Sequence, residues 1–376
     1  MMSRFTRTAP VDVEQVRSRV GAVEEPEIEQ SLADLGMLRD VRVERSRAYV
    51  DIALTASDYP LADQLRDAVR TAATTVEGVR SVDVRLDVMT ERERMQLAQV
   101  LGLRARPVDP VTGASQPAAR IYAVASGKGG VGKSSVTANL AVALARSGQR
   151  VGVIDADVWG YSIPQLFGVR RAPVALKGSM LPVQAHGVRL MSTGFFVDDE
   201  EPVVWRGPML HKAIEQFLSD VHWGDLDVLL VDLPPGTGDV TLSLVELLPT
   251  AALLAVTTPQ PAAQTVAARV GRLALDMRMP IAGVVENMSA LACGSCGEQT
   301  PLFGSGGGAI LAQKLGTPLL GQVPLDIALR EAGDAGTPVV LRDPDAVSAQ
   351  EMVKIASTLP RTSRSLAGLS LNLTVV

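Results

Sequence analysis

One short segment of this sequence, which contains two lysines and several glycines, indicates its chemistry most clearly. Residues 126–135 read SGKGGVGKSS, and residues 127–134 fit the spacing G-x-x-x-x-G-K-[S/T]. Glycines at these positions let successive backbone N–H groups turn towards one anion, and a helix that begins there adds its positive end. A phosphate-binding loop of the Walker A type is therefore predicted, with ATP as its expected ligand.

The side chains of this loop have separate expected roles. Lys133 is expected to be catalytic by bridging the β- and γ-phosphates, and the hydroxyl of Ser134 to bind Mg²⁺. Lys128 is additional to the motif, and in the plain alternative it only points into solvent. The residues predicted to bind the nucleotide in this loop are Gly127, Lys128, Gly129, Gly130, Val131, Gly132, Lys133, Ser134 and Ser135.

Three aspartates follow buried apolar runs and supply the carboxylates that a nucleotide-bound metal requires. Asp232 ends the run in VLLVDLPPGTGD, and we interpret it as a Walker B ligand of Mg²⁺ followed by a loop that senses the γ-phosphate. Asp155 and Asp157 lie in DADVWG, where the carboxyl end of a strand meets the ligand edge of an open α/β sheet. We assign Asp157 to the attacking water and Asp155 to the outer shell of the metal. Ordinary turn or helix capping is the alternative for all three.

The elements that position these residues follow from apolar patterning. Near-continuous apolar runs, typical of strands buried on both faces, alternate with helical segments at 137–148 and 262–275. This pattern predicts a P-loop domain of the α/β class with a doubly wound, mostly parallel sheet. The predicted strands lie at 121–126, 150–157, 228–234, 251–259 and 280–289.

The N-terminal part has a different pattern and predicts a small α+β domain. Helices are expected at 12–20, 28–36, 60–76 and 90–103, with paired strands at 41–54 and another strand at 79–86. A stretch rich in proline and small residues follows and is typical of a linker. The expected division is a small domain at 1–103, a linker at 104–119, the P-loop domain at 120–360 and a tail at 361–376.

Composition limits the class of protein. Apolar residues make up 47% of the 376 residues and the net charge is −5, with no block of about five like charges that would indicate a nucleic-acid or anionic-membrane surface. No apolar run approaches the roughly 20 residues of a membrane-spanning helix, and the N-terminus lacks the apolar middle of a secretory signal. We expect a cytoplasmic protein that binds neither nucleic acid nor membrane.

The extra lysine, together with DADVWG and VDLPPGTGD, resembles the deviant Walker A ATPases, the group of MinD, ParA, ArsA and the nitrogenase iron protein. The resemblance implies a homodimer in which Lys128 reaches the nucleotide of the partner subunit and acts as a catalytic cation. It therefore gives the second lysine of the loop a function.

Within that group, residues 121–341 are similar to the Mrp/ApbC family of iron–sulfur cluster carriers, as seen in ENMSALACGSCGEQTPLFGSGGG and LGTPLLGQVPLD. The resemblance implies a [4Fe-4S] cluster held at Cys293 and Cys296 between two subunits, and delivery to apo-proteins. A cubane or a zinc ion takes four ligands and one chain offers two cysteines, so a two-fold axis would complete either site. Zinc and a thioredoxin-like redox pair are the alternatives, although a redox pair should open a helix.

The family resemblance also implies a role for Asn287, which would pair with the adenine edge of the nucleotide. The plain alternative is an asparagine that forms a turn.

The small domain resembles SufT and eukaryotic iron–sulfur targeting factors. Two departures weaken a cluster-handling role: the usual Asp-Pro-Glu reads Glu25-Pro26-Glu27, and Asp58-Tyr59-Pro60 lacks the cysteine that often precedes the proline. A docking or regulatory module is expected. For the whole chain the prediction is an ATPase that carries iron–sulfur clusters. The alternative is a positioning ATPase of the MinD/ParA kind acting on membrane or DNA, which the C-terminal segment, without a basic amphipathic pattern, does not favour.

Overall fold

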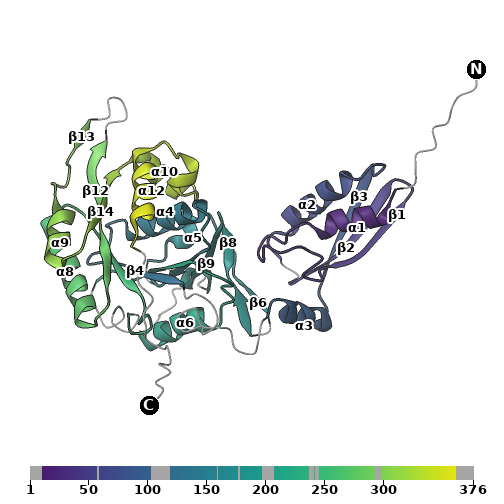
Figure 1. Cartoon of the computed structure of the whole chain (residues 1–376), viewed down its shortest axis with the longest axis horizontal. Coiled ribbons are helices and arrows are strands. Elements are labelled where there is room, and N and C mark those ends of the chain that lie inside the picture. The colour runs from purple at the N-terminus through teal and green to yellow at the C-terminus, as the bar shows by residue number, and fades with distance from the viewer. Residues whose placement is uncertain are drawn as a thin grey trace, which may run out of the picture. The chain divides into compact units, whose positions relative to one another are not determined.

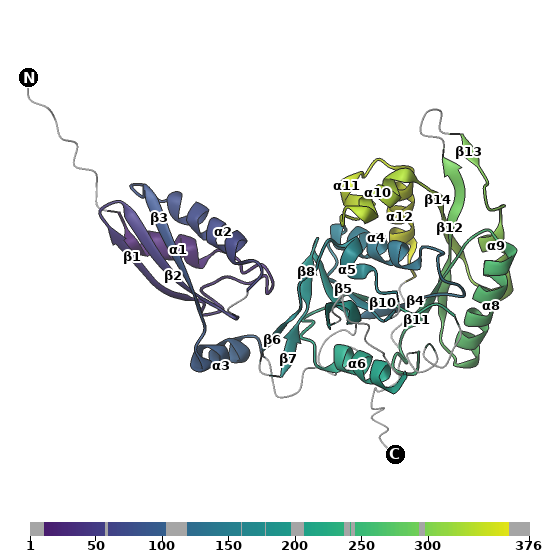
Figure 2. The ribbon, with the colours of Figure 1, turned by 180° about the vertical axis from the view of Figure 1, so that it is seen from behind.

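The structure is a computed structural model that describes residues 11–56, 59–102, 119–158, 160–176, 178–196, 207–236, 241, 245–292 and 298–360. The chain forms two compact units (Figures 1 and 2). The first contains residues 1–107 together with 173–181, and the second contains 108–172 and 182–376. Within the described ranges, no helix has the length and apolar character needed to cross a membrane.

The first unit has a three-stranded sheet packed against helices, as expected of an α+β domain. The central strand of the sheet pairs antiparallel with one neighbour and parallel with the other, so the chain crosses over through a helix between the parallel pair. Its elements are α1 (Val13–Gly21), β1 (Leu38–Glu44), β2 (Arg47–Leu54), α2 (Ala62–Thr74), β3 (Ser81–Val88) and α3 (Glu91–Val100). The strands and these three helices confirm the sequence prediction for this region.

In this unit, side chains cap the N-terminal ends of helices α1 and α3. The Asp12 carboxylate accepts hydrogen bonds from the first backbone N–H groups of α1. Thr90 and Glu93 form a reciprocal capping box at the start of α3. The same Glu93 carboxylate lies 2.7 Å from Nε of Arg39 in β1, which ties α3 to the sheet.

One helix expected from the sequence is absent. Residues 26–36 form successive turns instead of the predicted helix at 28–36. Oδ2 of Asp34 accepts the hydroxyl proton of Ser31, and Oε2 of Glu25 accepts the backbone N–H groups of Glu27 and Ile28. Glu29 has a positive φ of 57°, which a continuous helix does not allow. Side-chain hydrogen bonds to the backbone therefore replace the helical ladder in a segment whose apolar spacing suits a helix.

The first unit also takes a β-hairpin from the middle of the chain. β6 (Val174–Leu176) and β7 (Ser179–Leu181) pair antiparallel. Val174, Leu176 and Leu181 are buried in the same apolar cluster as α1, α2 and the strands of the small sheet. The sequence analysis did not predict this hairpin, because three-residue strands are too short to produce a period.

The second unit is built on a nine-stranded sheet, and five of its strands are those predicted from the apolar runs. The strands are β4 (Arg120–Ser126), β5 (Val151–Asp155), β8 (Val183–Ala185), β9 (Val188–Ser192), β10 (Val228–Asp232), β11 (Ala252–Thr257), β12 (Ile281–Ala292), β13 (Gln299–Thr300) and β14 (Leu319–Leu325). The helices are α4 (Lys133–Arg146), α5 (Ile163–Leu166), η1 (Thr193–Phe196), α6 (Gly207–Ser219), α8 (Pro261–Asp276), α9 (Gly307–Leu315), α10 (Ile327–Asp334), α11 (Val339–Arg342) and α12 (Val347–Thr358).

The strand order is β13-β12-β11-β4-β10-β5-β9-β8, and β14 pairs with β12. Among the described strands of this sheet, only β8 and β13, at the two ends of this order, pair antiparallel with their neighbours. Alternate residues of one strand enter different cores: Leu254 of β11 packs with α4 and α12, whereas Ala255 packs with α8 and α9. Helices therefore cover both faces of the sheet, and the predicted doubly wound, mostly parallel α/β fold is confirmed (Figure 2).

Candidate active site

The loop between β4 and α4 has the geometry of a phosphate cradle. Gly132 precedes the first residue of α4 and has a φ of +79°, a left-handed conformation that glycine adopts without strain. At the other end of the loop, a Cβ on Gly127 would lie 2.2 Å from the backbone nitrogen of Ala267 in α8. The loop is therefore pressed between the end of β4 and α8, and only glycine allows this approach.

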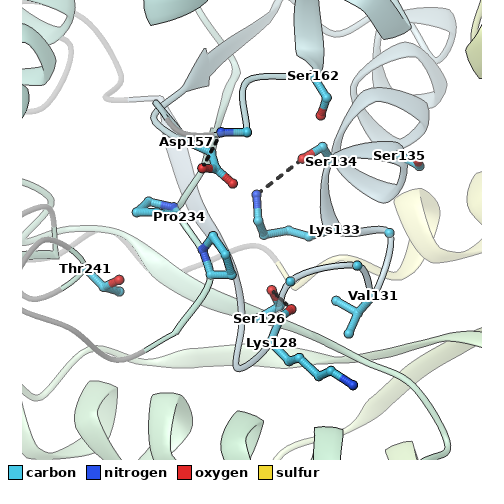
Figure 3. Close-up of a pocket in the computed structure, with 15 residues that line it drawn as sticks. Ser126, Lys128, Val131, Lys133, Ser134, Ser135, Asp157, Ser162, Pro234 and Thr241 are labelled. Carbon is cyan, nitrogen blue, oxygen red and sulfur yellow. Dashed lines mark hydrogen bonds between the residues drawn. The ribbon is translucent and has the colours of Figure 1, made fainter. Parts of the chain in front are cut away.

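A cavity of about 800 Å³ opens over the loop (Figure 3). It is large enough for a nucleotide, since ligand pockets typically measure some 300–1,000 Å³. All the predicted loop residues except Gly127, which is buried, line it. The lining consists of Ser126, residues 128–135, Asp157, Gly160, Ser162, Pro234, Pro235 and Thr241.

The predicted Walker A and Walker B residues meet at one carboxylate. Oδ2 of Asp232, at the end of β10, lies 2.6 Å from Nζ of Lys133 and 2.5 Å from Oγ of Ser134. Asp232 is fully buried and Lys133 is 6% exposed, so little solvent screens their attraction. The oxygen atoms of Ser134 and Asp232 thus converge at one point, which fits the hard oxygen ligands that Mg²⁺ prefers.

Asp155 and Asp157 lie near this point but in different surroundings. Asp155 is fully buried and is the parallel-strand partner of Asp232. Its oxygens accept the backbone N–H groups of Asp157 and Ile163 and the hydroxyl of Ser192. Burial raises the pKa of Asp155 to about 8, and the neighbouring Asp232 adds to this effect while Lys133 opposes it.

The two aspartates therefore differ in what they contact. Asp157 accepts the backbone N–H of Gly160 and also lines the cavity. A water molecule in the cavity could therefore reach it, and its expected role towards an attacking water stays a prediction. Asp155 holds the loop that carries Asp157 and the start of α5, and it does not line the cavity. Its predicted role in the outer shell of the metal stays a prediction.

Asn287, in β12, contacts the phosphate loop itself. Its Nδ2 donates to the backbone carbonyl of Val131 at 2.9 Å, and it packs so closely that a Cβ on Gly132 would meet it. Its Oδ1 is buried and has no hydrogen-bond partner among the described residues. An adenine amino group would donate its hydrogen bond to this oxygen, and the adenine role of Asn287 stays a prediction. The hydrogen bond from Asn287 to Val131 is an additional contact, which the sequence analysis missed.

Lys128 is exposed at the tip of the loop. Its backbone carbonyl accepts the hydroxyl of Ser126 at 3.0 Å, which fixes the backbone of the tip. Figure 3 shows its side chain pointing away from the Lys133 ammonium. Within a single chain the side chains of Lys128 and Lys133 thus point away from each other.

Cys293 and Cys296 lie outside the described residues. The strands on either side are described: Ala292 of β12 pairs antiparallel with Gln299 of β13. The cysteines therefore fall in the connection between two paired strands, and β12 is the strand that also carries Asn287.

The small unit has a buried polar pair that involves Tyr59, the residue directly before Pro60. The hydroxyl of Tyr59 donates to the Glu25 carboxylate, and both side chains are buried. Burial, reinforced by the charge of Glu25, raises the pKa of Tyr59. Tyr59 and Glu25 thus act as a structural pair for the turns at 26–36.

Sequence reasoning missed a further buried polar residue in the second unit. Thr137 is fully buried on α4, and its hydroxyl lies 2.7 Å from Oδ1 of Asp232. The signal was present in the sequence, because Thr137 lies one helical turn after Lys133 in a helix that is otherwise largely apolar.

The fold and this site define a P-loop nucleoside triphosphatase. A family model described as NUBPL iron-transfer P-loop NTPase matches residues 118–360, and one described as iron–sulfur cluster assembly protein matches residues 13–84. The chain belongs to this iron-transfer P-loop NTPase family, and the resemblance noted from the sequence is confirmed.

Similar proteins extend over the whole chain. A Mycobacterium leprae protein named iron–sulfur cluster carrier protein is 46% identical over 99% of this chain and 99% of its own. A protein of the same name from Synechocystis is 39% identical over 90% of this chain and 94% of its own. A solved nucleotide-binding protein from Archaeoglobus fulgidus, in complex with ADP, is 38% identical, covers 60% of this chain and 89% of its own, and superposes with a TM-score of 0.53.

Proposed function

We propose that this protein is an ATP-dependent iron–sulfur cluster carrier. In this proposal two subunits hold one [4Fe-4S] cluster through Cys293 and Cys296 of each chain and pass it to apo-proteins. The observation that carries the proposal is the course of β12: this strand holds Asn287 against the phosphate loop and leads directly into the Cys-x-x-Cys segment. In this proposal one strand joins the nucleotide site to the cluster site.

The residues of the loop supply the chemistry of ATP hydrolysis in this proposal. Backbone N–H groups at the start of α4 hold the phosphates, and Lys133 stabilises the charge that develops on them. Asp157 lines the cavity and would orient the attacking water. Ser134 and Asp232 would hold Mg²⁺, which would neutralise phosphate charge when bound.

Lys128 and the subunit count belong to the same proposal. Lys128 is exposed at the loop tip, so its ammonium is free to approach a second subunit that faces the cavity. The chain has two cysteines, and a four-iron cluster takes four thiolates, so two chains are required for one cluster. A homodimer satisfies both requirements at once.

The described surroundings of the cysteines favour a bound cluster over a redox pair. A thioredoxin-like pair opens a helix, whereas the element that follows here is the strand β13. A connection between two paired strands, with a glycine after each cysteine, allows two such loops to approach closely. The names of the similar proteins from Mycobacterium leprae and Synechocystis support the same choice.

Anaerobic reconstitution tests the proposal. Purified protein is incubated with ferrous iron and sulfide, freed of excess reagent and assayed for iron, sulfide and visible absorption. It is then mixed with an apo-enzyme that requires a [4Fe-4S] cluster, and the recovery of that enzyme's activity is followed with and without ATP.

Cluster binding should disappear in Cys293→Ala and Cys296→Ala but persist in Ser295→Ala, a matched change between them. A spectrum unchanged in Cys296→Ala would defeat the shared-cluster site and return the cysteine pair to the zinc or redox alternatives. Failure of the reconstituted protein to activate the apo-enzyme would remove the carrier function. Binding of one zinc ion per dimer in place of iron and sulfide would assign the same four thiolates to zinc.

A further inference from the structure

Thr137 makes an unusual contact for a residue inside a helix. It lies on α4, fully buried, and its Oγ1 is 2.7 Å from Oδ1 of Asp232 and 3.0 Å from the backbone carbonyl of Lys133. A threonine within a helix often returns its proton to the carbonyl four residues earlier. Here a buried carboxylate from another element lies closer than that carbonyl.

The hydroxyl has one proton, so it donates to one of these two acceptors at a time. Asp232 carries the ion pair with Lys133, and a hydrogen bond to a charged acceptor is shorter and stronger than one to a neutral carbonyl. The distances follow this order. We therefore assign the proton of Thr137 to Oδ1 of Asp232.

This bond leaves the two oxygens of Asp232 with separate tasks. Oδ2 faces Lys133 and Ser134, and Oδ1 is held by Thr137. A carboxylate attached at one oxygen only rotates easily, because the torsion at its sp² carbon is broad. Attachment at both oxygens fixes its plane and aims Oδ2 at the point where the Ser134 hydroxyl arrives.

We propose that Thr137 is a positioning residue that orients Asp232 for the magnesium-dependent step of nucleotide binding and hydrolysis. The inference rests on the proposed ATP hydrolysis at this loop and is independent of the cluster. Thr137, Lys133 and Ser134 all lie on α4, so a nucleotide-dependent movement of this helix would move the orienting hydroxyl together with Lys133 and Ser134.

The test compares three variants of the full-length protein. Thr137→Val keeps the shape of the side chain and removes the hydroxyl, and Thr137→Ser keeps the hydroxyl. Thr193→Val is the matched control: Thr193 is also fully buried, and its hydroxyl has no hydrogen-bond partner among the described residues. For each protein, ADP affinity is measured with Mg²⁺ and with EDTA, and kcat and KM are measured for ATP.

Thr137→Val loses a hydrogen bond to a charged group. Its ADP affinity in the presence of Mg²⁺ and its kcat for ATP should each fall about tenfold or more. ADP affinity in EDTA should stay close to that of the wild type, because the phosphate contacts of the loop remain. Thr137→Ser should recover most of the loss, and Thr193→Val should match the wild type.

Three results would overturn the inference: wild-type kinetics in Thr137→Val, an equal loss of ADP affinity with and without Mg²⁺, or no recovery in Thr137→Ser. The second would show that Thr137 only supports the fold of the loop. A wild-type protein that hydrolyses no ATP would instead refute the proposed ATPase, so the two failures are distinguishable.

Discussion

Nζ of Lys133 lies 2.6 Å from Oδ2 of Asp232, and both groups are shielded from solvent. A phosphate that binds Lys133 must therefore compete with this carboxylate. A divalent cation next to Asp232 would favour the phosphate, because it would replace the lysine as the partner of the carboxylate. Binding of the nucleotide and of the metal should consequently be coupled through this one pair.

Replacing Lys133 tests this coupling. Lys133→Ala should abolish ATP hydrolysis, because the main cation facing the γ-phosphate is lost. It should also lower the free energy of unfolding, measured by denaturant titration without added nucleotide, by about 3 kcal/mol or more, since it leaves a buried carboxylate without its cation. The double variant Lys133→Ala/Asp232→Asn should regain most of this stability while remaining inactive. Equal stability of the two variants would show that the pair carries no net charge interaction.

Lys128 should affect hydrolysis more than binding. We expect Lys128→Ala to bind ADP nearly as tightly as the wild type, because the backbone of the loop makes the phosphate contacts, but to lose most ATP hydrolysis. Lys314→Ala, which removes an exposed lysine from α9, should behave as the wild type. A photo-crosslink from the γ-phosphate of a bound ATP analogue to Lys128 of the other subunit would support its action between subunits, and a crosslink only within one chain would contradict it.

The hairpin at β6 and β7 should stabilise the first unit. Leu176 is 1% exposed in the core of that unit, and Leu176→Ala should lower the free energy of unfolding by roughly 2–5 kcal/mol. Met180→Ala, at a half-buried position of the same hairpin, should have a clearly smaller effect. Limited proteolysis of the full-length protein would detect the difference as earlier cleavage within residues 11–102. Identical cleavage in the two variants would mean that the hairpin contributes nothing to that core.

The ion pair of Arg39 and Glu93 should make stability depend on pH. Hydrogen bonding from Arg39 lowers the pKa of Glu93 from 4.5 to about 2. The unfolded chain therefore binds more protons than the folded chain in this interval, so the contribution is fully present above about pH 4.5 and is lost as the pH falls towards 2. Thermal unfolding should show Arg39→Met to be less stable than the wild type at pH 6, and the difference should shrink towards pH 2.

Arg42→Met is the control for this comparison. Its guanidinium also faces carboxylates, Asp40 and Asp51, but the side chain is 64% exposed and solvent screens the interaction. It should change the stability little at either pH. A constant difference between Arg39→Met and the wild type across the whole pH range would assign the effect to packing instead of charge.

The sequence predicted the parts of this structure that have a strong local pattern. The strands ending at Ser126, Asp155 and Asp232 were recognised because their apolar runs are nearly continuous, and parallel strands bring their carboxyl ends to one edge. The meeting of Lys133 and Asp232 follows from that topology. The turns at 26–36 were missed, because the carboxylate of Glu25 captures backbone N–H groups that the apolar spacing assigns to a helix.

Contacts made between distant segments were harder to predict. The hairpin at 174–181 joins a core formed by residues far from it in the chain, and no local period indicates such an association. Likewise, the contact of Asn287 with Val131 depends on how β12 passes the loop, and not on either sequence segment alone. The residues of the loop could be named from spacing, but the contacts that orient them required the fold.

The central claim is that one cluster is shared by two chains, and the iron content of a mixed dimer tests it most directly. Dimers are assembled from one wild-type chain and one chain carrying both Cys293→Ala and Cys296→Ala, purified through two different affinity tags and reconstituted with iron and sulfide. Wild-type dimers should bind about four irons, and the mixed dimer, with two of the four thiolates, should bind almost none. A mixed dimer that keeps half of the wild-type iron would contradict the shared site and place a separate site on each chain.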